Sequence, residues 1–244
     1  MISYKDGLEI SVSPIMAALQ GWGKRSSFDQ ELIGLLFDNG LDLNKEIDGA
    51  TVYYNIISSS PEEFSIKMLD RISDLNKMQQ ECIGYLNENK EEIEEFVPAS
   101  YLQKAIFSGH FELATAMIEK GAKIEKGYEL KLLYSAVDKD NMKFVKYLFE
   151  NEYITTLENL KGTETLLAKA LLHNNYETFM LLVKKGANIE AKCDSYIYIK
   201  KDGIYETKSI HAPTVFTQLI EQASEDIILE VLKFSNIDVN IKLP

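Results

Sequence analysis

A helical segment closed by a glycine constrains the fold of this chain most strongly. Residues 109–125 read GHFELATAMIEKGAKIE, and the apolar positions recur at spacings of three to four: Phe111, Leu113, Ala114, Met117 and Ile118. This spacing places the apolar side chains on one face of a helix, which is then buried. Gly121 follows the last of them, where a helix can end in a left-handed conformation without a Cβ clash. The segment predicts a short helix that is buried on one side and has a fixed end.

The same helix end recurs along the chain. It is found at Gly40, Ile72, Gly121, Glu152, Gly186 and Asn236, with glycine in three of the six copies. Successive ends are 32, 49, 31, 34 and 50 residues apart. Three steps lie near the roughly 33-residue period of a known helical repeat, and the two long steps exceed it by about 16 residues. The spacing therefore predicts six repeats with two insertions.

The apolar positions of the helix also recur at fixed distances from each end. The four positions held by Leu113, Ala114, Met117 and Ile118 are apolar in almost every copy, and the exceptions are Ser65, Thr178 and Lys233. In the last copy this alignment selects Ile228, Leu229, Leu232 and Lys233. A polar residue there is expected, because a terminal repeat needs a more polar outer face.

These units resemble ankyrin repeats. The first helix of that family opens with T-P-L-H-x-A, and residues 13–18 read SPIMAA. Thr51, Ser100 and Thr165 stand at the helix-capping position of three other copies. The resemblance implies an all-α solenoid of helix–turn–helix units, and a protein that binds other proteins without catalysing a reaction.

One ankyrin-repeat domain is expected to span residues 1–244, since no Gly/Ser-rich or Pro-rich linker divides the chain. The repeats are expected at approximately 13–44, 51–76, 100–125, 131–156, 165–190 and 212–240, and the insertions at approximately 77–97 and 193–210.

The first insertion is predicted to be helical. Met78, Cys82, Ile83 and Leu86 fall on one helical face, and a run of glutamates follows at 91, 92, 94 and 95. Two interpretations remain open for this segment. The glutamates either form the solvated face of a helical spacer or serve as an acidic docking patch.

The second insertion is predicted to be a long β-hairpin. Residues 196–199 read YIYI, Asp202-Gly203 follows, and residues 204–207 read IYET. Asp-Gly between β-rich runs indicates a two-residue hairpin turn. Tyr196 and Tyr198 then share one face of the strand, and Ile197 and Ile199 share the other. The tyrosines either cover the neighbouring repeat or contact a partner.

Composition excludes several classes of function. The chain carries 38 acidic and 26 basic residues, a net charge of −12, which argues against binding to nucleic acid. No apolar run is long enough to span a bilayer, and no secretory signal is recognisable at the N-terminus. We therefore expect no membrane association and a cytoplasmic protein, or a secreted effector without a recognisable signal peptide. Cys82 and Cys193 are too few for a disulfide framework or a zinc site.

Catalytic motifs are not recognisable in the sequence, so no enzymatic activity, catalytic residue, cofactor or metal site is predicted. No phosphate-binding loop is present, and the three histidines lack partners at metal-ligand spacing. His110 is interpreted as a structural residue of the turn between two helices.

A protein partner is expected instead, bound by a monomer through the concave face and the hairpin fingers of the solenoid. The candidate contact residues are Trp22, Phe107, Asp138, Leu172, His173, Tyr196, Tyr198 and Tyr205. The negative charge favours a basic partner. The alternative hypothesis is therefore an acidic inhibitor or immunity-type protein that masks a basic toxin or enzyme.

Overall fold

The computed structural model describes most of the chain. The described residues are 2–3, 9–10, 15, 30–47, 49–86, 92–158, 163–190, 193–201, 204–212 and 214–234. Within these ranges the chain forms eleven α-helices, and its strands pair only as two-stranded antiparallel ribbons. The predicted helical-repeat fold class is therefore confirmed. The chain divides into two compact units, Met1–Glu125 (unit 1) and Lys126–Pro244 (unit 2), and the single domain stays a prediction.

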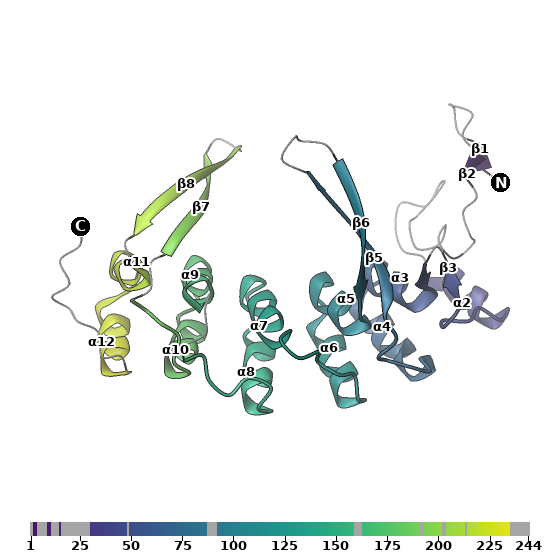
Figure 1. Ribbon diagram of the computed structural model, residues 1–244, viewed down its shortest axis with the longest axis horizontal. Helices are drawn as coiled ribbons and strands as arrows, with labels where there is room; N and C mark the ends of the chain where they lie inside the picture. Colours follow the sequence, from purple (N-terminus) through teal and green to yellow (C-terminus); the bar gives the residue numbers. More distant parts are fainter. Residues whose placement is uncertain are drawn as a thin grey trace. The chain divides into compact units, whose positions relative to one another are not determined.

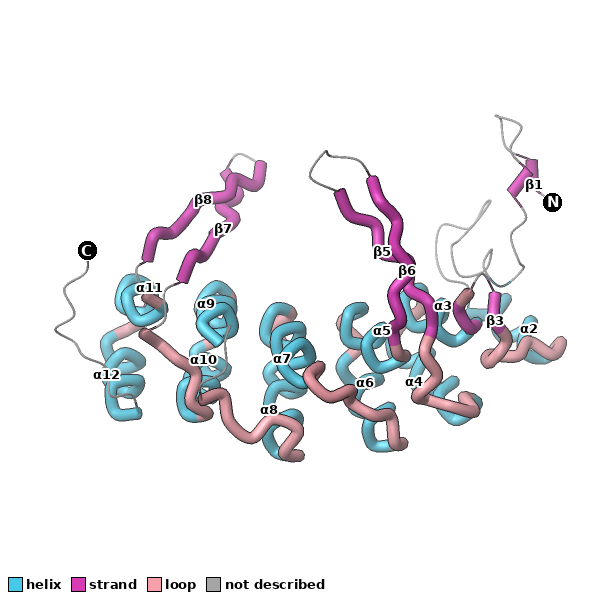
Figure 2. The backbone as a smooth tube through the Cα atoms, in the orientation of Figure 1, coloured by secondary structure: helices cyan, strands magenta, loops and turns pink. Residues whose placement is uncertain are grey.

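Unit 1 contains two helix pairs with a β-hairpin between them (Figures 1 and 2). Its helices are α2 (Gln30–Asp38), α3 (Val52–Ser59), α4 (Glu62–Met68), α5 (Tyr101–Ser108) and α6 (Phe111–Glu119), with a 3-10 turn at Leu69–Arg71. Its strands are β1 (Ile2–Ser3), β2 (Glu9–Ile10), β3 (Glu46–Ile47), β4 (Ala50–Thr51), β5 (Gln79–Leu86) and β6 (Glu92–Ala99). Helix α3 packs on α5, and α4 packs on α6. The hairpin β5–β6 extends away from both pairs.

Unit 2 repeats this plan with three helix pairs. They are α7 (Glu129–Asp138) with α8 (Met142–Glu150), α9 (Thr163–Leu172) with α10 (Tyr176–Lys184), and α11 (Val215–Gln222) with α12 (Glu225–Phe234). Between the last two pairs lies the hairpin of β7 (Cys193–Lys201) and β8 (Ile204–Ala212). The first helices α7, α9 and α11 form one row and the second helices α8, α10 and α12 another, with the hairpin on the side of the first helices (Figure 1).

Capping side chains define where the first helices begin. The Thr51 hydroxyl accepts the Tyr54 backbone N–H of α3, and Ser100 forms a reciprocal capping box with Gln103 of α5. Both predicted caps are thus confirmed, and each satisfies a backbone donor that the helix leaves unpaired. Thr165 is not a cap, because α9 already begins at Thr163. Thr214 caps α11 in the last pair.

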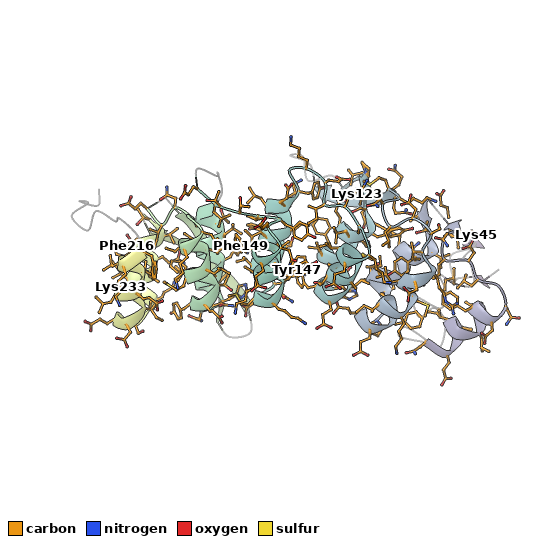
Figure 3. The ribbon with its side chains drawn as sticks, turned by 90° about the horizontal axis from the view of Figure 1, so that it is seen from below. Lys45, Lys123, Tyr147, Phe149, Phe216 and Lys233 are labelled. Atoms are coloured by element: carbon orange, nitrogen blue, oxygen red, sulfur yellow. The ribbon has the colours of Figure 1, made fainter. Side chains whose placement is uncertain are left out.

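The second helices carry the predicted buried stripe. Leu113, Ala114 and Met117 of α6 are fully buried, and Phe144, Val145 and Leu148 of α8 repeat the pattern. Phe149 closes the same stripe on α8 (Figure 3). The Lys185 ammonium lies over the Phe149 ring, 5.1 Å from its centroid. Each helix therefore buries one face only, and it does so against its neighbours in the stack.

The alignment of the last copy was wrong by one residue. Ile228 donates its backbone N–H to the carbonyl of Ser224, as Ala114 does to that of His110, so the equivalent positions are Ile227, Ile228, Val231 and Leu232. Val231 is fully buried, whereas Leu229 is 49% exposed and Lys233 is exposed on α12 (Figure 3). Lys233 is consequently no exception to the apolar pattern, since it does not occupy a core position.

The first insertion is a β-hairpin, and the prediction of a helical insertion at 77–97 was wrong. β5 and β6 pair from Gln79 with Ala99 to Leu86 with Glu92. A short apolar pattern fits a helix and a strand about equally well, and Ile83, Tyr85, Ile93, Phe96 and Val97 are residue types that favour strands. Pro98 is tolerated because it lies near the end of a strand that has no further neighbour in its two-stranded ribbon.

Candidate partner-binding site

The first helices expose apolar side chains at equivalent positions. Left-handed residues follow three of these helices: Gly109 with φ 80°, Asp140 with φ 53° and Asn174 with φ 53°. Phe107, Asp138 and Leu172 each lie two residues before one of them. Phe107 is 63% exposed and Leu172 is 38% exposed. A large apolar side chain that stays in water within an otherwise well-buried helix is a candidate contact residue.

Asp138 and His173 lie close together. His173 contacts the end of α7, and Asp138 contacts α9. The His173 Nε2 atom is 2.9 Å from the Asp138 carbonyl oxygen, and the Lys169 ammonium is 2.5 Å from the Asp138 carboxylate. Asn175 donates to the Asp140 carboxylate at 2.6 Å. These contacts join the α7 and α9 repeats, so both candidates already have partners within the chain.

The second hairpin confirms the β-structure predicted for residues 193–210. Lys201 pairs with Ile204, which leaves a two-residue connection at 202–203. Those two residues lie outside the described part of the chain. The register pairs Tyr196 with Ser209, Tyr198 with Thr207 and Lys200 with Tyr205. Because paired residues share a face, Tyr205 joins Tyr196 and Tyr198 on one side of the ribbon. Trp22 also lies outside the described residues.

The root of the first hairpin is a network of polar side chains that the sequence analysis did not identify. The Tyr54 hydroxyl donates to one oxygen of Glu81, and the Lys104 ammonium donates to both oxygens of that carboxylate, at 2.6 and 2.9 Å. The Lys104 nitrogen also lies 5.0 Å from the centroid of the Tyr54 ring.

A second layer of hydrogen bonds lies beside this network. The Gln79 Oε1 atom accepts the Thr51 backbone N–H at 2.8 Å, and the Thr51 hydroxyl shares a 2.8 Å hydrogen bond with the Tyr101 hydroxyl. Thr51, Gln79 and Tyr101 are all at most 2% exposed. In the sequence, Tyr54 stands where the family pattern T-P-L-H-x-A, read from Thr51, has histidine.

The buried tyrosines of unit 1 stay protonated at neutral pH. Burial raises the pKa of Tyr53 well above its ordinary value of 10.0, and the nearby Tyr101 adds to the shift. Burial also raises the pKa of Tyr54, and its hydrogen bond to Glu81 adds to the shift. Burial raises the pKa of Tyr101 in the same way. All three phenols therefore act as hydrogen-bonding groups and not as bases.

His110 has a structural position at the turn between α5 and α6. It is the residue that precedes α6, and burial lowers its pKa, although Glu62 opposes the shift. The Leu113 backbone N–H at the start of α6 donates to the Glu62 carboxylate at 2.9 Å. A carboxylate of the preceding repeat thus supplies the cap that His110 does not.

A shallow groove lies between the second helices of unit 2. Met142, Tyr176, Met180 and Ile227 line it, with ion pairs Lys146–Glu177 and Lys184–Glu230 at its rim. Among the described residues, no cluster of His, Cys, Asp or Glu could hold a metal ion. The described helices include none that is long and apolar enough to cross a membrane.

Part of the chain matches a known family of repeats. Residues 102–193 match the family model of ankyrin repeats (3 copies). A similar solved chain belongs to the complex of Bd0816, a predatory endopeptidase from Bdellovibrio bacteriovorus, with the immunity protein Bd3460. It is 18% identical, with coverage of 93% of this chain and 100% of that chain and a TM-score of 0.50. The ankyrin repeat protein EF0377 is 17% identical, with the same coverage and TM-score. At such identities the structures show a shared fold alone. No curated protein matches the sequence.

Proposed function

We propose that this chain, whose residues 102–193 match the family model of ankyrin repeats, binds a protein partner through the exposed side of its first helices and through its two hairpins. Ankyrin repeats are in general modules of protein–protein interaction. Non-covalent binding requires no catalytic residue, metal or cofactor from this chain.

The exposed Phe107 and Leu172 carry this proposal. Both lie at the same position of a first helix, although neighbouring positions of these helices are buried. In α5, Ala105 and Ile106 are at most 2% exposed, whereas Phe107 is 63% exposed. Burying such a side chain in an interface contributes on the order of 2 kcal/mol. An apolar anchor on a rigid helix also loses little conformational entropy on binding.

Affinity capture with the full chain tests the proposal. A partner captured by the wild type is identified, purified and titrated against Phe107→Ser and Leu172→Ser. We expect each variant to weaken binding about tenfold or more. Leu35→Ser is the matched control, because Leu35 is 60% exposed on the second helix α2. Equal affinities for all three variants and the wild type would contradict the proposed surface.

The hairpin contribution is tested by a variant with Tyr196, Tyr198 and Tyr205 changed to Ser. Loss of the partner by this variant, with helix content unchanged, assigns binding to the second hairpin. Retention of the partner, together with loss in Phe107→Ser or Leu172→Ser, assigns binding to the first helices and removes the second hairpin from the binding surface.

A second candidate is an acidic inhibitor that masks a basic toxin or enzyme. The charge of the first hairpin favours it: residues 79–99 contain six glutamates and one lysine, a net charge of −5 within the −12 of the chain. Complementary charge speeds the encounter of two proteins and is screened by salt. Affinity that falls at least about tenfold between 50 and 500 mM salt supports masking of a basic partner. Salt-independent affinity supports the apolar contacts of the first candidate instead.

A further inference from the structure

The carboxylate of Glu81 joins the first hairpin to two helices at once. Tyr54 belongs to α3, which precedes the hairpin, and Lys104 belongs to α5, which follows it. Both donate to Glu81 of β5, and the Lys104 ammonium also faces the Tyr54 ring. The three side chains therefore close a triangle, in which each contacts the other two.

Partial burial makes this ion pair stronger than the surface pairs of the same unit. The side chains of Lys104 and Glu81 are 17% and 27% exposed, and Tyr54 is 3% exposed. The pair between Lys77 and Glu46 also lies near the hairpin root, but its side chains are 38% and 57% exposed. Exposed pairs contribute little because water and salt screen them, whereas a hydrogen-bonded pair sheltered from water is costly to break.

Backbone pairing alone does not fix the direction of the hairpin. The ladder from Gln79–Ala99 to Leu86–Glu92 holds β5 to β6, but it does not hold the ribbon to the helices. At the root, β6 continues through Ser100 directly into α5. Rotation about this connection is opposed by side-chain contacts of the root, and among the side chains that the structure describes the Glu81 triangle joins the ribbon to both helices.

We propose that Glu81 is the positioning residue of the first hairpin, and that with Tyr54 and Lys104 it sets the angle at which β5–β6 leaves the helices (Figure 2). The consequence for a partner rests on the proposed function, since a hairpin held in one direction is ordered before binding. A preordered arm loses less conformational entropy when the partner binds.

Distance distributions between two spin labels test this positioning in the full chain. The labels are attached to cysteines at Glu92 of β6 and Glu119 of α6, with Cys82 and Cys193 changed to Ser. In the wild type we expect one narrow distribution. Glu81→Ala is expected to broaden it at least about twofold, because the ribbon then samples several directions. Tyr54→Phe keeps the ring and removes only the hydroxyl, so it is expected to broaden the distribution less.

Glu46→Ala is the matched control, because it also removes a glutamate–lysine pair near the hairpin root. We expect its distribution to equal that of the wild type. Wild-type widths in both Glu81→Ala and Tyr54→Phe would overturn the proposal, and so would equal broadening in Glu46→Ala. Should Glu81→Ala fail to fold, as judged by helix content, Tyr54→Phe decides.

Partner binding measured with the Glu81→Ala variant distinguishes the positioning role of Glu81 from the proposed function. A broadened distance distribution in Glu81→Ala together with weakened partner binding supports both the positioning role and the proposed function. A broadened distribution with unchanged binding supports the positioning role and removes the first hairpin from the binding surface.

Discussion

The helices at the roots of the two hairpins present different side chains at equivalent positions. At the first hairpin, Tyr54 and Lys104 converge on Glu81. The equivalent positions at the second hairpin are Ala168, aligned with Tyr54 by the repeated pattern of buried residues, and Gln218, aligned with Lys104 by the helix caps. Ala168 has no polar group, and the Gln218 Oε1 atom is buried without a hydrogen-bond partner in the described part of the chain. A shared repeat plan therefore does not imply a shared root.

Charge distinguishes the hairpins as well. Residues 79–99 carry a net charge of −5, whereas residues 193–212 contain three acidic and three basic side chains and have three tyrosines on one face. The first hairpin suits electrostatic recognition and the second suits aromatic contact. Insertions at equivalent sites of a repeat can thus be specialised separately while the helices beneath them stay alike.

High pH is expected to destabilise unit 1 more than unit 2, and this is the largest difference that we predict between the two units. Tyr53, Tyr54 and Tyr101 have raised pKa values in the folded state, so the unfolded chain loses their protons first, near pH 10. The three protonated phenols contribute fully to the free energy of unfolding below pH 10, and this contribution is lost as the pH rises above 10. Tyr53 and Tyr54 then each cost about 1.4 kcal/mol per pH unit, or roughly 3 kcal/mol together at pH 11, and Tyr101 acts in the same direction.

Hydrogen exchange followed from pH 8 to pH 11, corrected for intrinsic rates, measures this difference. None of the described tyrosine side chains of unit 2 is buried, so α3 and α5 are expected to lose protection before α9 and α10. Simultaneous loss in both units would contradict the assignment to the buried phenols.

Moving the lysine of the first root to the second should be destabilising. Gln218→Lys places an ammonium where the native side chain is 1% exposed and where no carboxylate equivalent to Glu81 is described. We expect a loss of about 3 kcal/mol in the free energy of unfolding, measured in urea, because none of the described residues offers the buried charge a partner. Gln222→Lys, on the exposed end of the same helix, is the control and is expected to be neutral. A stable Gln218→Lys would show that the second root can hold a charge.

Removal of a helix cap is expected to destabilise the chain more at the first root than at the second. Thr51→Val leaves the Tyr54 N–H and the Tyr101 hydroxyl unpaired in a buried site, which should cost about 2 kcal/mol. Thr214→Val removes the cap of α11 from a half-buried site and should cost about 1 kcal/mol or less. Hydrogen exchange of α3 and α11 reports each effect locally. Equal losses would mean that burial of the root is unimportant.

The repeated part of the molecule was largely predictable from sequence. The period, the caps Thr51 and Ser100, and the exposed Phe107 and Leu172 follow from local rules of helix formation that act over a few residues. The second hairpin was predictable because Asp202-Gly203 marks its turn. The first hairpin lacks such a dipeptide, and its glutamates and apolar spacing also suit a helix.

The root network could not be predicted, because it joins residues far apart in sequence. Tyr54 and Glu81 are 27 residues apart, and Glu81 and Lys104 are 23 apart. Glu81 is one of many carboxylates in the chain, and it becomes distinct only when β5 places it between α3 and α5. A wrong assignment of this segment as helix therefore concealed the network as well.

Two glutamine substitutions with opposite expected signs provide the finest test of the comparison. Gln79→Met removes the acceptor of the Thr51 N–H at the first root and should destabilise the chain by about 1 kcal/mol. Gln218→Met replaces a buried Oε1 atom that has no partner among the described residues, and should be neutral or stabilise the chain by up to about 1 kcal/mol. Both changes preserve side-chain length, so packing is similar and the hydrogen bond is the main variable. Urea unfolding of the two variants beside the wild type measures the difference. Destabilisation of similar size in both would show that Gln218 has a polar partner, and the two roots would then be more alike than their side chains indicate.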